Sequence, residues 1–460
     1  MLDQLQAQQI FDRTRRFCSV DEIEVIFSST DYSLTRFANN TIHQNVSELN
    51  EVASIRVAFD GKTARATTNR FDDDSLRRAV QVAESMAKVQ ERDPERLPMA
   101  RASEGNGSET ALSRWFEPTA AITPGDRAEA VAKVVAIAKK NGLVTAGICS
   151  CSRHADAVIN SNGLNVYHRQ TSAEVSITML ADDSSGWQKN NSPDVSQLDP
   201  ARLAEVAAQK ARDSRTPREL PAGKYDVVLE PAAVLDLTGF MFWDFGGLAI
   251  LDQRSFLNNR IGTKLFGDNI TIMDDVYHPL QSNAPFDGEG VNRRRVNLVE
   301  NGVVKSLVYS RGTAEKMRKS QPAAQVGPIA VTGHGFPLPN EIGEAPVNIV
   351  YVTGGGEQTV EQMIAATERG ILITRLWYIR EVDPYEKILT GMTRDGTFLV
   401  ENGKIQCGIR NFRFNQSLIE MLSSVEAMSK PMRSSGEESF DMVAPAMKVR
   451  GFNFTEVTRF

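Results

Sequence analysis

The sequence contains little of what marks secreted, membrane-spanning or nucleic-acid-binding proteins. Its four cysteines are too few and too irregularly spaced for a disulfide framework. No apolar run approaches the ~20 residues of a membrane span, and the polar opening MLDQLQAQQIFDRTRRF is unlike a signal peptide. A formal net charge of -6 disfavours non-specific binding to nucleic acid, which needs basic surface. We therefore expect a cytoplasmic protein with neither a membrane nor a nucleic-acid partner.

Potential metal ligands are also sparse. There are five histidines, and none lies between His168 and His278. Cys149 and Cys151, with His154 close by, resemble part of a metal site. On a strand, however, the two cysteines share one face while His154 points to the other, and a fourth ligand is missing. We interpret the cysteines as buried or half-buried thiols.

The length of 460 residues exceeds that of one ordinary domain, so we expect two or more. The best linker is SRTPRELPAGK, residues 214–224, because it contains two prolines and a glycine between an expected helix and an expected strand. This divides the chain into an N-terminal α/β domain, residues 1–215, and a C-terminal β-rich domain, residues 222–460.

The N-terminal half has a repeated pattern. Each unit has strand-like runs, an Asp-containing turn and an Asp-capped helix with alanines on one face, which indicates an internal repeat over residues 22–89 and 144–213. The sheet of the two units should carry its helices on one side. Expected strands are 22–28, 33–44, 52–58, 63–68, 158–169 and 174–180; expected helices are 3–17, 74–88, 123–141 and 199–212; residues 90–120, with Gly-Asn-Gly at 105–107, should be a loop.

The C-terminal half reads mostly as alternating strands. Two Glu-Asn-Gly sequences, at 300–302 and 401–403, are typical of hairpin turns. We expect helices at about 359–369 and 416–427, a mobile loop at 429–438 and a last strand at 446–454. The fold class predicted is α+β, with a curved, mostly antiparallel or barrel-like sheet in the second domain.

The chain is organised around residues 225–275. Residues 225–229 form a short β-branched run closed by Glu230-Pro231, which predicts a strand feeding a new element. Apolar residues from Ala232 to Ile250, interrupted by Gly246-Gly247, favour a buried helix followed by a tight turn.

This half of the chain resembles the TldD/PmbA family of zinc-peptidase-related proteins, also called modulators of gyrase. The motifs that carry the resemblance are spread in order along it: SFLNNRIG (255–262), Asp274-Asp275, FDGEG (286–290) followed by RRR (293–295), NLVENGVVKSLVY (297–309), GILITRLWYIREVDP (370–384), GMTRDGTFLVENGKI (391–405), RNFRFNQSLIEML (410–422) and APAMKVRGFNFTEVT (444–458).

The resemblance implies two kinds of member. The catalytic kind, TldD, carries a His-Glu-x-x-x-His helix, in which two imidazoles bind zinc and the Glu takes a proton from zinc-bound water. The second kind, TldE/PmbA, lacks this motif and pairs with TldD. The corresponding positions here are Phe240, Met241, Phe242, Trp243, Asp244, Phe245 and Gly246. The chain is therefore similar to the second kind, with no cofactor of its own and zinc expected in the partner.

Other candidate site residues have plainer interpretations beside them. Asp287 and Glu289 are paired carboxylates, more often structural than catalytic; the resemblance places their loop, with Phe286, at the chamber between subunits. His334 lies in a glycine-flanked loop, where a histidine is usually a surface residue, although histidine is the residue type suited to proton transfer at neutral pH. Thr353-Gly-Gly-Gly-Glu357 lacks the Lys-Ser/Thr of a phosphate loop. Arg375 and Trp377 should share one face of a strand. Their plain interpretation is packing within the sheet, and the alternative is contact with a bound peptide.

We predict a non-catalytic subunit that acts with a TldD-type zinc peptidase on unfolded peptides and is inactive alone. Two alternatives stay open. One is a homodimeric peptide-binding protein without peptidase activity. The other is a peptidase with an atypical metal site built from His278, His334 and Cys407.

Overall fold

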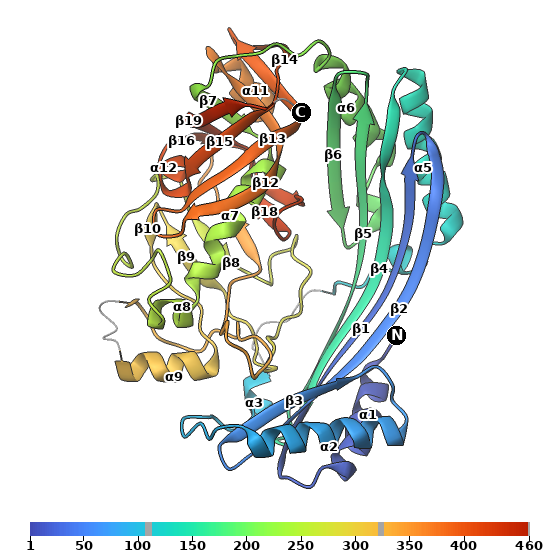
Figure 1. Ribbon diagram of the computed structural model, residues 1–460, viewed down its shortest axis with the longest axis vertical. Coiled ribbons are helices and arrows are strands. Elements are labelled where there is room, and N and C mark those ends of the chain that lie inside the picture. The colour runs from blue at the N-terminus through green and yellow to red at the C-terminus, as the bar shows by residue number, and fades with distance from the viewer. Residues whose placement is uncertain (106–112, 321–325, 459–460) are drawn as a thin grey trace.

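A long curved sheet and a second, more compact body lie side by side in the computed structural model, which describes residues 1–105, 113–320 and 326–458 (Figure 1). The long sheet belongs to the N-terminal half and is antiparallel throughout, with strand order β3-β2-β1-β4-β5-β6. Its strands are β1 Glu22–Ala38, β2 Thr41–Phe59, β3 Lys62–Thr68, β4 Val144–Asn160, β5 Asn165–Leu180 and β6 Ser185–Ser192.

The strand order is symmetric about the central β1–β4 pair, so that β1-β2-β3 on one side corresponds to β4-β5-β6 on the other. Two predicted strands were wrong. The prediction at 33–44 crosses the turn at Asn39-Asn40, where both residues have positive φ, and the prediction at 158–169 crosses the turn between β4 and β5. Polar asparagines inside strand-like sequence mark tight turns here because asparagine tolerates the left-handed conformation.

The N-terminal helices cover one face of this sheet. They are α1 Gln4–Phe17, α2 Asp73–Val89, α5 Pro124–Lys140 and α6 Pro200–Asp213. The short helices are α3 Ala102–Gly105, α4 Glu117–Ala120 and η1 Val195–Gln197, and α3 lies on the opposite face, against Leu164 and Val166. Asp72 caps α2, and Thr123 and Asp126 form a capping box on α5. Val25, which packs with α1 and α2, and Phe37, which packs with α5 and α6, differ by an even number of positions, so they share a face. The predicted one-sided arrangement is confirmed.

The second body contains two mixed sheets. One has strand order β10-β9-β8-β11-β18-β17, and the other β12-β7-β19-β15-β13-β14, with β16 paired to β19. The pairs β7–β12 and β11–β18 are parallel. The strands are β7 Gly223–Leu229, β8 Ile272–Asp274, β9 Val296–Glu300, β10 Val303–Val304, β11 Ile349–Tyr351, β12 Arg369–Asp383, β13 Ile388–Glu401, β14 Lys404–Gly408, β15 Phe412–Ser417, β16 Val425–Met428, β17 Met432–Ser434, β18 Met442–Ala444 and β19 Met447–Val457.

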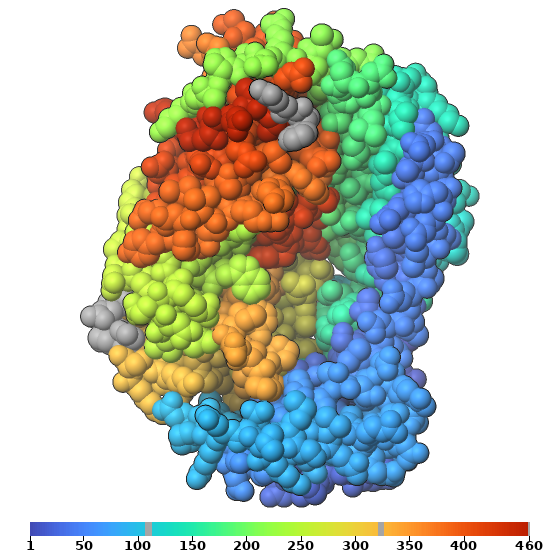
Figure 2. Space-filling model, viewed as in Figure 1, coloured from blue at the N-terminus to red at the C-terminus, as the bar shows by residue number. Residues whose placement is uncertain are grey.

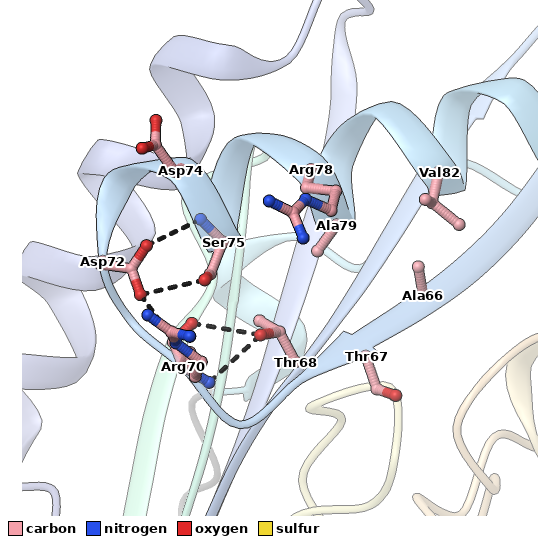
Figure 3. Close-up of a pocket in the computed structure, with 10 residues that line it drawn as sticks. All are labelled: Ala66, Thr67, Thr68, Arg70, Asp72, Asp74, Ser75, Arg78, Ala79 and Val82. Atoms are coloured by element: carbon pink, nitrogen blue, oxygen red, sulfur yellow. Dashed lines mark hydrogen bonds and ion pairs between the residues drawn. The ribbon is translucent and has the colours of Figure 1, made fainter.

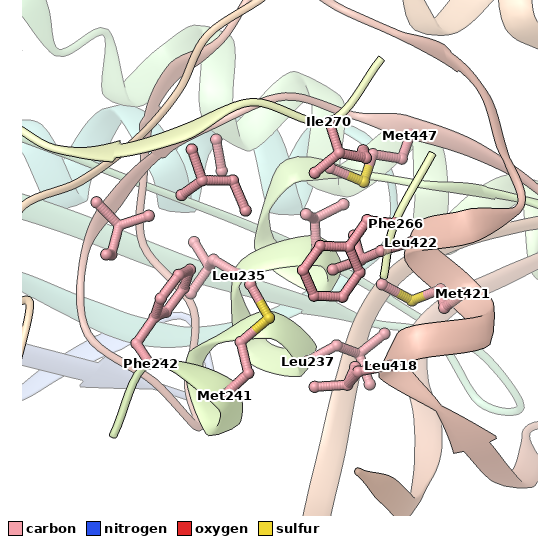
Figure 4. Packing of buried hydrophobic residues seen from close by; sticks show 14 of the residues in the cluster. Leu235, Leu237, Met241, Phe242, Phe266, Ile270, Leu418, Met421, Leu422 and Met447 are labelled. Carbon is pink, nitrogen blue, oxygen red and sulfur yellow. The ribbon is translucent and has the colours of Figure 1, made fainter. Parts of the chain in front are cut away.

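Helix α7, Pro231–Phe242, runs through the core of the second body. Its side chains are apolar on nearly every side because β7, β12, β17, β18 and α12 all contact it. Figure 4 shows Leu235, Leu237, Met241 and Phe242 of α7 among side chains from distant parts of the chain. The remaining helices are η2 Trp243–Phe245, α8 Gly247–Leu251, α9 Arg311–Ser320, α11 Val360–Ala365 and α12 Leu418–Ser423.

The α+β class predicted for the chain is confirmed, while several boundaries differ. Helices α11 and α12 are shorter than predicted, since the chain continues into β12 and β16. Part of the predicted 90–120 loop, residues 106–112 with most of the Gly-Asn-Gly sequence, lies outside the described residues. The domain boundary between 215 and 222 stays a prediction.

The segment 429–438, predicted to be a mobile loop, is anchored. It contains β17, its residues Ser434 and Ser435 are buried, and a Cβ at Gly436 would lie 2.1 Å from an Asp236 oxygen. Its polar composition predicted exposure to solvent, but its polar atoms form hydrogen bonds with the rest of the protein instead. No described helix is long and apolar enough to cross a membrane.

Candidate functional site

The motif position, residues 240–246, lies where α7 ends, passes through one 3₁₀ turn and continues into α8. Met241, Phe242 and Phe245 point into the core, while Trp243 is 49% exposed. The Trp243 ring stacks on Phe336, with ring centroids 6.0 Å apart and an interplanar angle of 23°. A stacked indole thus occupies this part of the surface.

Asp244 is the only carboxylate of the motif position, and it is committed to an ion pair. Its Oδ2 lies 2.5 Å from Lys387 Nζ, which also donates to Glu381 Oε1 at 2.7 Å. Asp244 Oδ1 accepts the Phe256 N–H at 3.1 Å. Burial raises the pKa of Asp244, and Lys387 opposes that shift. Lys387 and Asp244 are both nearly inaccessible to solvent.

These residues do not fit the zinc ion that the family motif implies. Zinc sites in proteins use imidazole, thiolate and carboxylate donors in a tetrahedral set. Within residues 240–246, Asp244 is the only side chain of these donor types. Its oxygens already bond to Lys387 and to the Phe256 N–H, so the lysine ammonium group, not a metal ion, balances its charge. The motif position is a structural junction, so no catalytic step is derived through zinc bound to this chain.

Asp236 lies on α7, about two helical turns before Asp244, and it binds the segment that connects β17 to β18. It is buried, and its carboxylate accepts the backbone N–H groups of Glu437 and Glu438 at 2.9–3.2 Å. Burial raises the pKa of Asp236 to about 7, although the two N–H donors oppose the shift. Helix α7 therefore positions this segment through a single buried carboxyl group.

Asp287 and Glu289 are brought together and buried. Asp287 accepts the N–H groups of Glu289, Val291 and Gly335 at 2.8–3.0 Å, so it organises its own loop. Arg311 faces Glu289 at 3.5 Å. Burial raises the pKa of Glu289 to about 7, and the neighbouring Asp287 charge adds to the shift. Phe286 packs against the long sheet with Val158 and Leu164. The loop joins the two bodies.

His334 is fully buried and has an oxygen at each ring nitrogen. Nδ1 lies 2.9 Å from the Thr332 carbonyl oxygen, and Nε2 lies 2.9 Å from Asp274 Oδ1. Nδ1 also lies 3.0 Å from Thr332 Oγ1, whereas the contact of Nε2 with Asp274 lacks hydrogen-bond geometry. Asp274 also accepts from the N–H groups of Val347 and Asn348. Histidine nearby lowers the pKa of Asp274, against the effect of burial. His334 is thus held between Thr332 and Asp274 in the interior.

Arg375 lies at the contact between the two bodies. Its guanidinium bonds to Asp395, whose other oxygen accepts Ser185 Oγ of β6 at 2.6 Å. The same guanidinium lies 4.9 Å from the Trp187 ring centroid and 5.9 Å from that of Trp377. Arg375 and Trp377 share a face of β12, and Arg375 is buried between the bodies.

The other sequence candidates are scattered. Cys149 and Cys151 are buried in β4, and burial raises the pKa of Cys149 to about 11. His154 bonds to Asp156 and Thr30. Within residues 1–105, 113–320 and 326–458, no three His, Cys, Asp or Glu side chains come together as a metal site. A Cβ added at any of the glycines 354–356 would meet nothing within 4 Å, and α11 begins only at Val360.

The pocket between β3 and the start of α2 has a volume of about 410 Å³ and an open, polar rim (Figure 3). The pocket includes the N-terminus of α2, where free backbone N–H groups could bind an anion. However, Asp72 already accepts the Ser75 N–H and Oγ–H at 2.9 Å, and Arg70 bonds to Asp72. The capping groups satisfy one another, so the pocket offers little for an anion.

Three residues of the site escaped sequence analysis: Lys387, Asp274 as the partner of His334, and Asp236. Lys387 carries a weak signal, because it follows Asp383-Pro384 in a turn and has positive φ. Asp236 reads as an isolated polar residue in an apolar helix, which is a recognisable sign of a buried carboxyl group. Nothing in the sequence links Lys387 to Asp244.

Comparisons with known proteins agree with this architecture. Family models match in chain order: PmbA/TldA metallopeptidase domain 1 at residues 23–87, the central domain at 117–215 and the C-terminal domain at 222–456. TldE from Thermococcus kodakarensis has the same fold, with a TM-score of 0.84, 20% identity and coverage of 98% of this chain and 100% of that chain.

Two relatives align over part of their length. An uncharacterized protein of Methanocaldococcus jannaschii is 27% identical over 273 residues, which cover 58% of this chain and 61% of that protein. Metalloprotease PmbA of Escherichia coli O157:H7 is 21% identical over 302 residues, which cover 64% of this chain and 61% of that protein. Since the C-terminal model alone matches more than half of the residues, the chain belongs to the PmbA/TldA metallopeptidase family.

Proposed function

We propose that this protein is the non-catalytic subunit of a two-component zinc peptidase that processes unfolded peptides in the cytoplasm. Its partner is a TldD-type subunit that carries the His-Glu-x-x-x-His helix and the zinc ion. The observation that carries the proposal is the motif position, where buried aromatic side chains and the Asp244–Lys387 pair stand in place of zinc ligands. This chain contributes a wall of the chamber and a surface for the partner.

The preserved surroundings of the motif position support this role. α7 remains the central helix of the second body, and the loop with Asp287 and Glu289 is held by backbone N–H donors. A rigid scaffold that has lost its ligands is what a supporting subunit needs. Phe286, Asp287, Glu289 and His334 are too buried to touch a peptide directly, so we assign them to positioning the chamber wall. Trp377, which is 37% exposed, is the better candidate for contact.

The alternative with an atypical metal site has less support. His334 is fully buried, with Nδ1 bonded to Thr332 and Nε2 2.9 Å from Asp274, and His278 Nδ1 accepts the Leu280 N–H at 3.2 Å. Cys407 is half-buried on β14, in the other sheet of the second body. The homodimeric peptide-binding protein differs from the proposal in its partner and in having no peptidase role, and it is tested by the same experiment.

The test is reconstitution with the TldD-type protein of the same organism. Affinity-tagged chain should retain the partner through washing, and the mixture should degrade an unstructured peptide such as reduced casein, which this chain alone leaves intact. A partner whose motif Glu is replaced by Gln provides the matched control, since it should still bind while cleavage stops. A tight homodimer of this chain that ignores the partner would overturn the proposal.

A further inference from the structure

The upper part of β2 has an open edge. β2 pairs with β1 along its whole length, but β3 pairs only with Ala53–Phe59 of β2. Among the described residues, no strand pairs with the other side of residues 41–52. Figure 1 shows β2 as the outermost strand there, and Figure 2 shows the same hairpin on the surface of the molecule. An edge of this length presents a row of unpaired backbone N–H and C=O groups.

The other half of the sheet contains an equivalent edge that is partly paired with an extended segment. The counterpart of β2 is β5, whose partner β6 likewise covers only its second part, Ala173–Leu180. The first part of β5 is not entirely bare, because residues 114–116 of the same chain lie against Gln170 and Thr171. Arg114 forms a parallel bridge with Gln170, the Thr171 N–H donates to the Arg114 carbonyl at 3.0 Å, and the Phe116 N–H donates to Thr171 Oγ1 at 3.1 Å.

The open part of β2 lacks the usual protection of an exposed edge. Natural sheets place lysine, proline or strong bulges on free edges to prevent pairing. Residues 41–52 contain no Lys, Arg or Pro, and they expose Ile42 by 43% and Leu49 by 55%. One irregularity, at His43, precedes a regular register from Gln44 onward.

The charge on this edge has one sign. Its two charged side chains are Glu48 and Glu51. Glu51 lies 3.3 Å from the N-terminal ammonium group, whereas Glu48 has no ion-pair partner among the described residues. An incoming strand with a basic side chain would complement Glu48. On the equivalent edge of β5, Arg114 pairs through its backbone, while its guanidinium donates to the carbonyl oxygens of His278 and Pro279 in the second body.

From these observations we infer that residues 44–52 of β2 form a docking edge for an extended strand of the partner subunit, with basic and apolar side chains facing Glu48 and Leu49. The inference rests on the proposed function, because it names the surface through which the two subunits join. Strand addition gives affinity through backbone hydrogen bonds, and the charge fixes the partner's register.

Hydrogen exchange of the chain alone and in the reconstituted complex tests the inference. Backbone amides within 44–52 should exchange about tenfold or more slowly in the complex. The substitution Leu49→Lys should weaken partner binding about tenfold or more, because it places a charge on the edge and opposes a basic strand. Val82→Lys is the matched control: Val82 is 44% exposed on α2, and this variant should bind like the wild type.

The outcomes separate the two proposals. A complex that forms without protection of residues 44–52, or that tolerates Leu49→Lys as well as Val82→Lys, overturns the docking edge and leaves the proposed function standing. Failure of any complex to form overturns both. Protection of 44–52 in the chain alone, rising with its concentration, would identify a second copy as the occupant and overturn the assignment to the partner subunit.

Discussion

Asp244 and Lys387 show how single residues decide the chemistry at the motif position. A buried carboxylate with no partner would be costly, and a buried ammonium group without one equally so. Each neutralises the other at 2.5 Å, with Glu381 sharing the lysine. The same arrangement occurs at His334 and Asp274, where a histidine lies against a buried carboxylate. The charged residues at and around the motif position therefore maintain the structure.

The Asp244–Lys387 pair predicts a non-additive pair of substitutions. Lys387→Met leaves Asp244 buried without its cation and should lower the free energy of unfolding by roughly 3–5 kcal/mol. Asp244→Asn keeps the acceptor for the Phe256 N–H but loses the charge. The double variant should be more stable than the sum of the two losses implies, as measured by urea denaturation. Strictly additive losses would show that the two side chains do not interact in solution.

Asp236 predicts a pH-dependent stability. Its pKa rises from 3.8 to about 7 on folding because it is buried. The folded protein thus holds this proton more tightly than the unfolded chain. The contribution of Asp236 to stability is fully present below its unfolded pKa and is lost as the pH rises through about 7.

The substitution Asp236→Asn keeps an uncharged amide at this place, so its stability should fall less between about pH 5 and pH 8 than that of the wild type. The difference between the two curves should not exceed about 4 kcal/mol, the free energy of a shift of about three pKa units. Thermal unfolding across this pH range measures it. Parallel curves for the two proteins would mean that Asp236 does not titrate there.

Elements marked by local chemistry were predictable from sequence. The capped starts of α2 and α5 and the Glu-Asn-Gly turns depend on residues adjacent in the chain. The start of β4 was missed because Gly147 and small polar residues weaken its strand pattern. The anchored segment 429–438 was missed because its partner, Asp236, lies on a distant helix. Local signals thus gave most elements, whereas the site required contacts between remote segments.

Glycines at packed surfaces give a test at the level of elements. A Cβ at Gly186 of β6 would lie 2.2 Å from the Ala207 carbonyl oxygen of α6, so the helix would have to move. Gly186→Ala should lower the free energy of unfolding by about 1–3 kcal/mol. Gly312→Ala on α9 serves as the control, because nothing lies within 4 Å of its added methyl group. That variant should gain up to about 1 kcal/mol from helix propensity.

Circular dichroism melts of both variants measure these effects. Equal stability of Gly186→Ala and the wild type would contradict the close packing of α6 on β6.

At the scale of the whole molecule, a polar contact joins the long sheet to the second body. Arg375 lies between Trp187 of β6 and Trp377 of β12 and bonds to Asp395, which in turn accepts from Ser185. Lys189 and Asn191 of β6 extend the contact to Gly436 and Asp441. Since these groups are polar and mostly satisfied, they fix one orientation of the two bodies.

Substitutions of Arg375 should reduce stability in a graded way. Arg375→Lys keeps the charge but loses the planar contacts with the tryptophan rings, and Arg375→Met also leaves Asp395 with Arg394, 3.4 Å away, as its remaining cation. We expect the order wild type, Lys variant, Met variant, with the last losing roughly 1.5–3 kcal/mol, the size of a lost hydrogen bond to a charged group. Arg394 is half-exposed and lies 4.4 Å from the Trp377 ring centroid, and Arg394→Met should lose less than about 1 kcal/mol.

Urea denaturation followed by tryptophan fluorescence reports on these variants. An Arg375→Met protein as stable as the Arg394→Met protein would contradict the role of Arg375 at the junction.

The central claim is that this chain builds no zinc site and supports a partner that does. Its most direct test is the metal content and peptidase activity of the chain purified alone without chelators or affinity tags that bind metal. The account predicts substoichiometric zinc that washes away and no cleavage of an unstructured peptide. One firmly bound zinc ion per chain, together with cleavage in the absence of any partner, would contradict it.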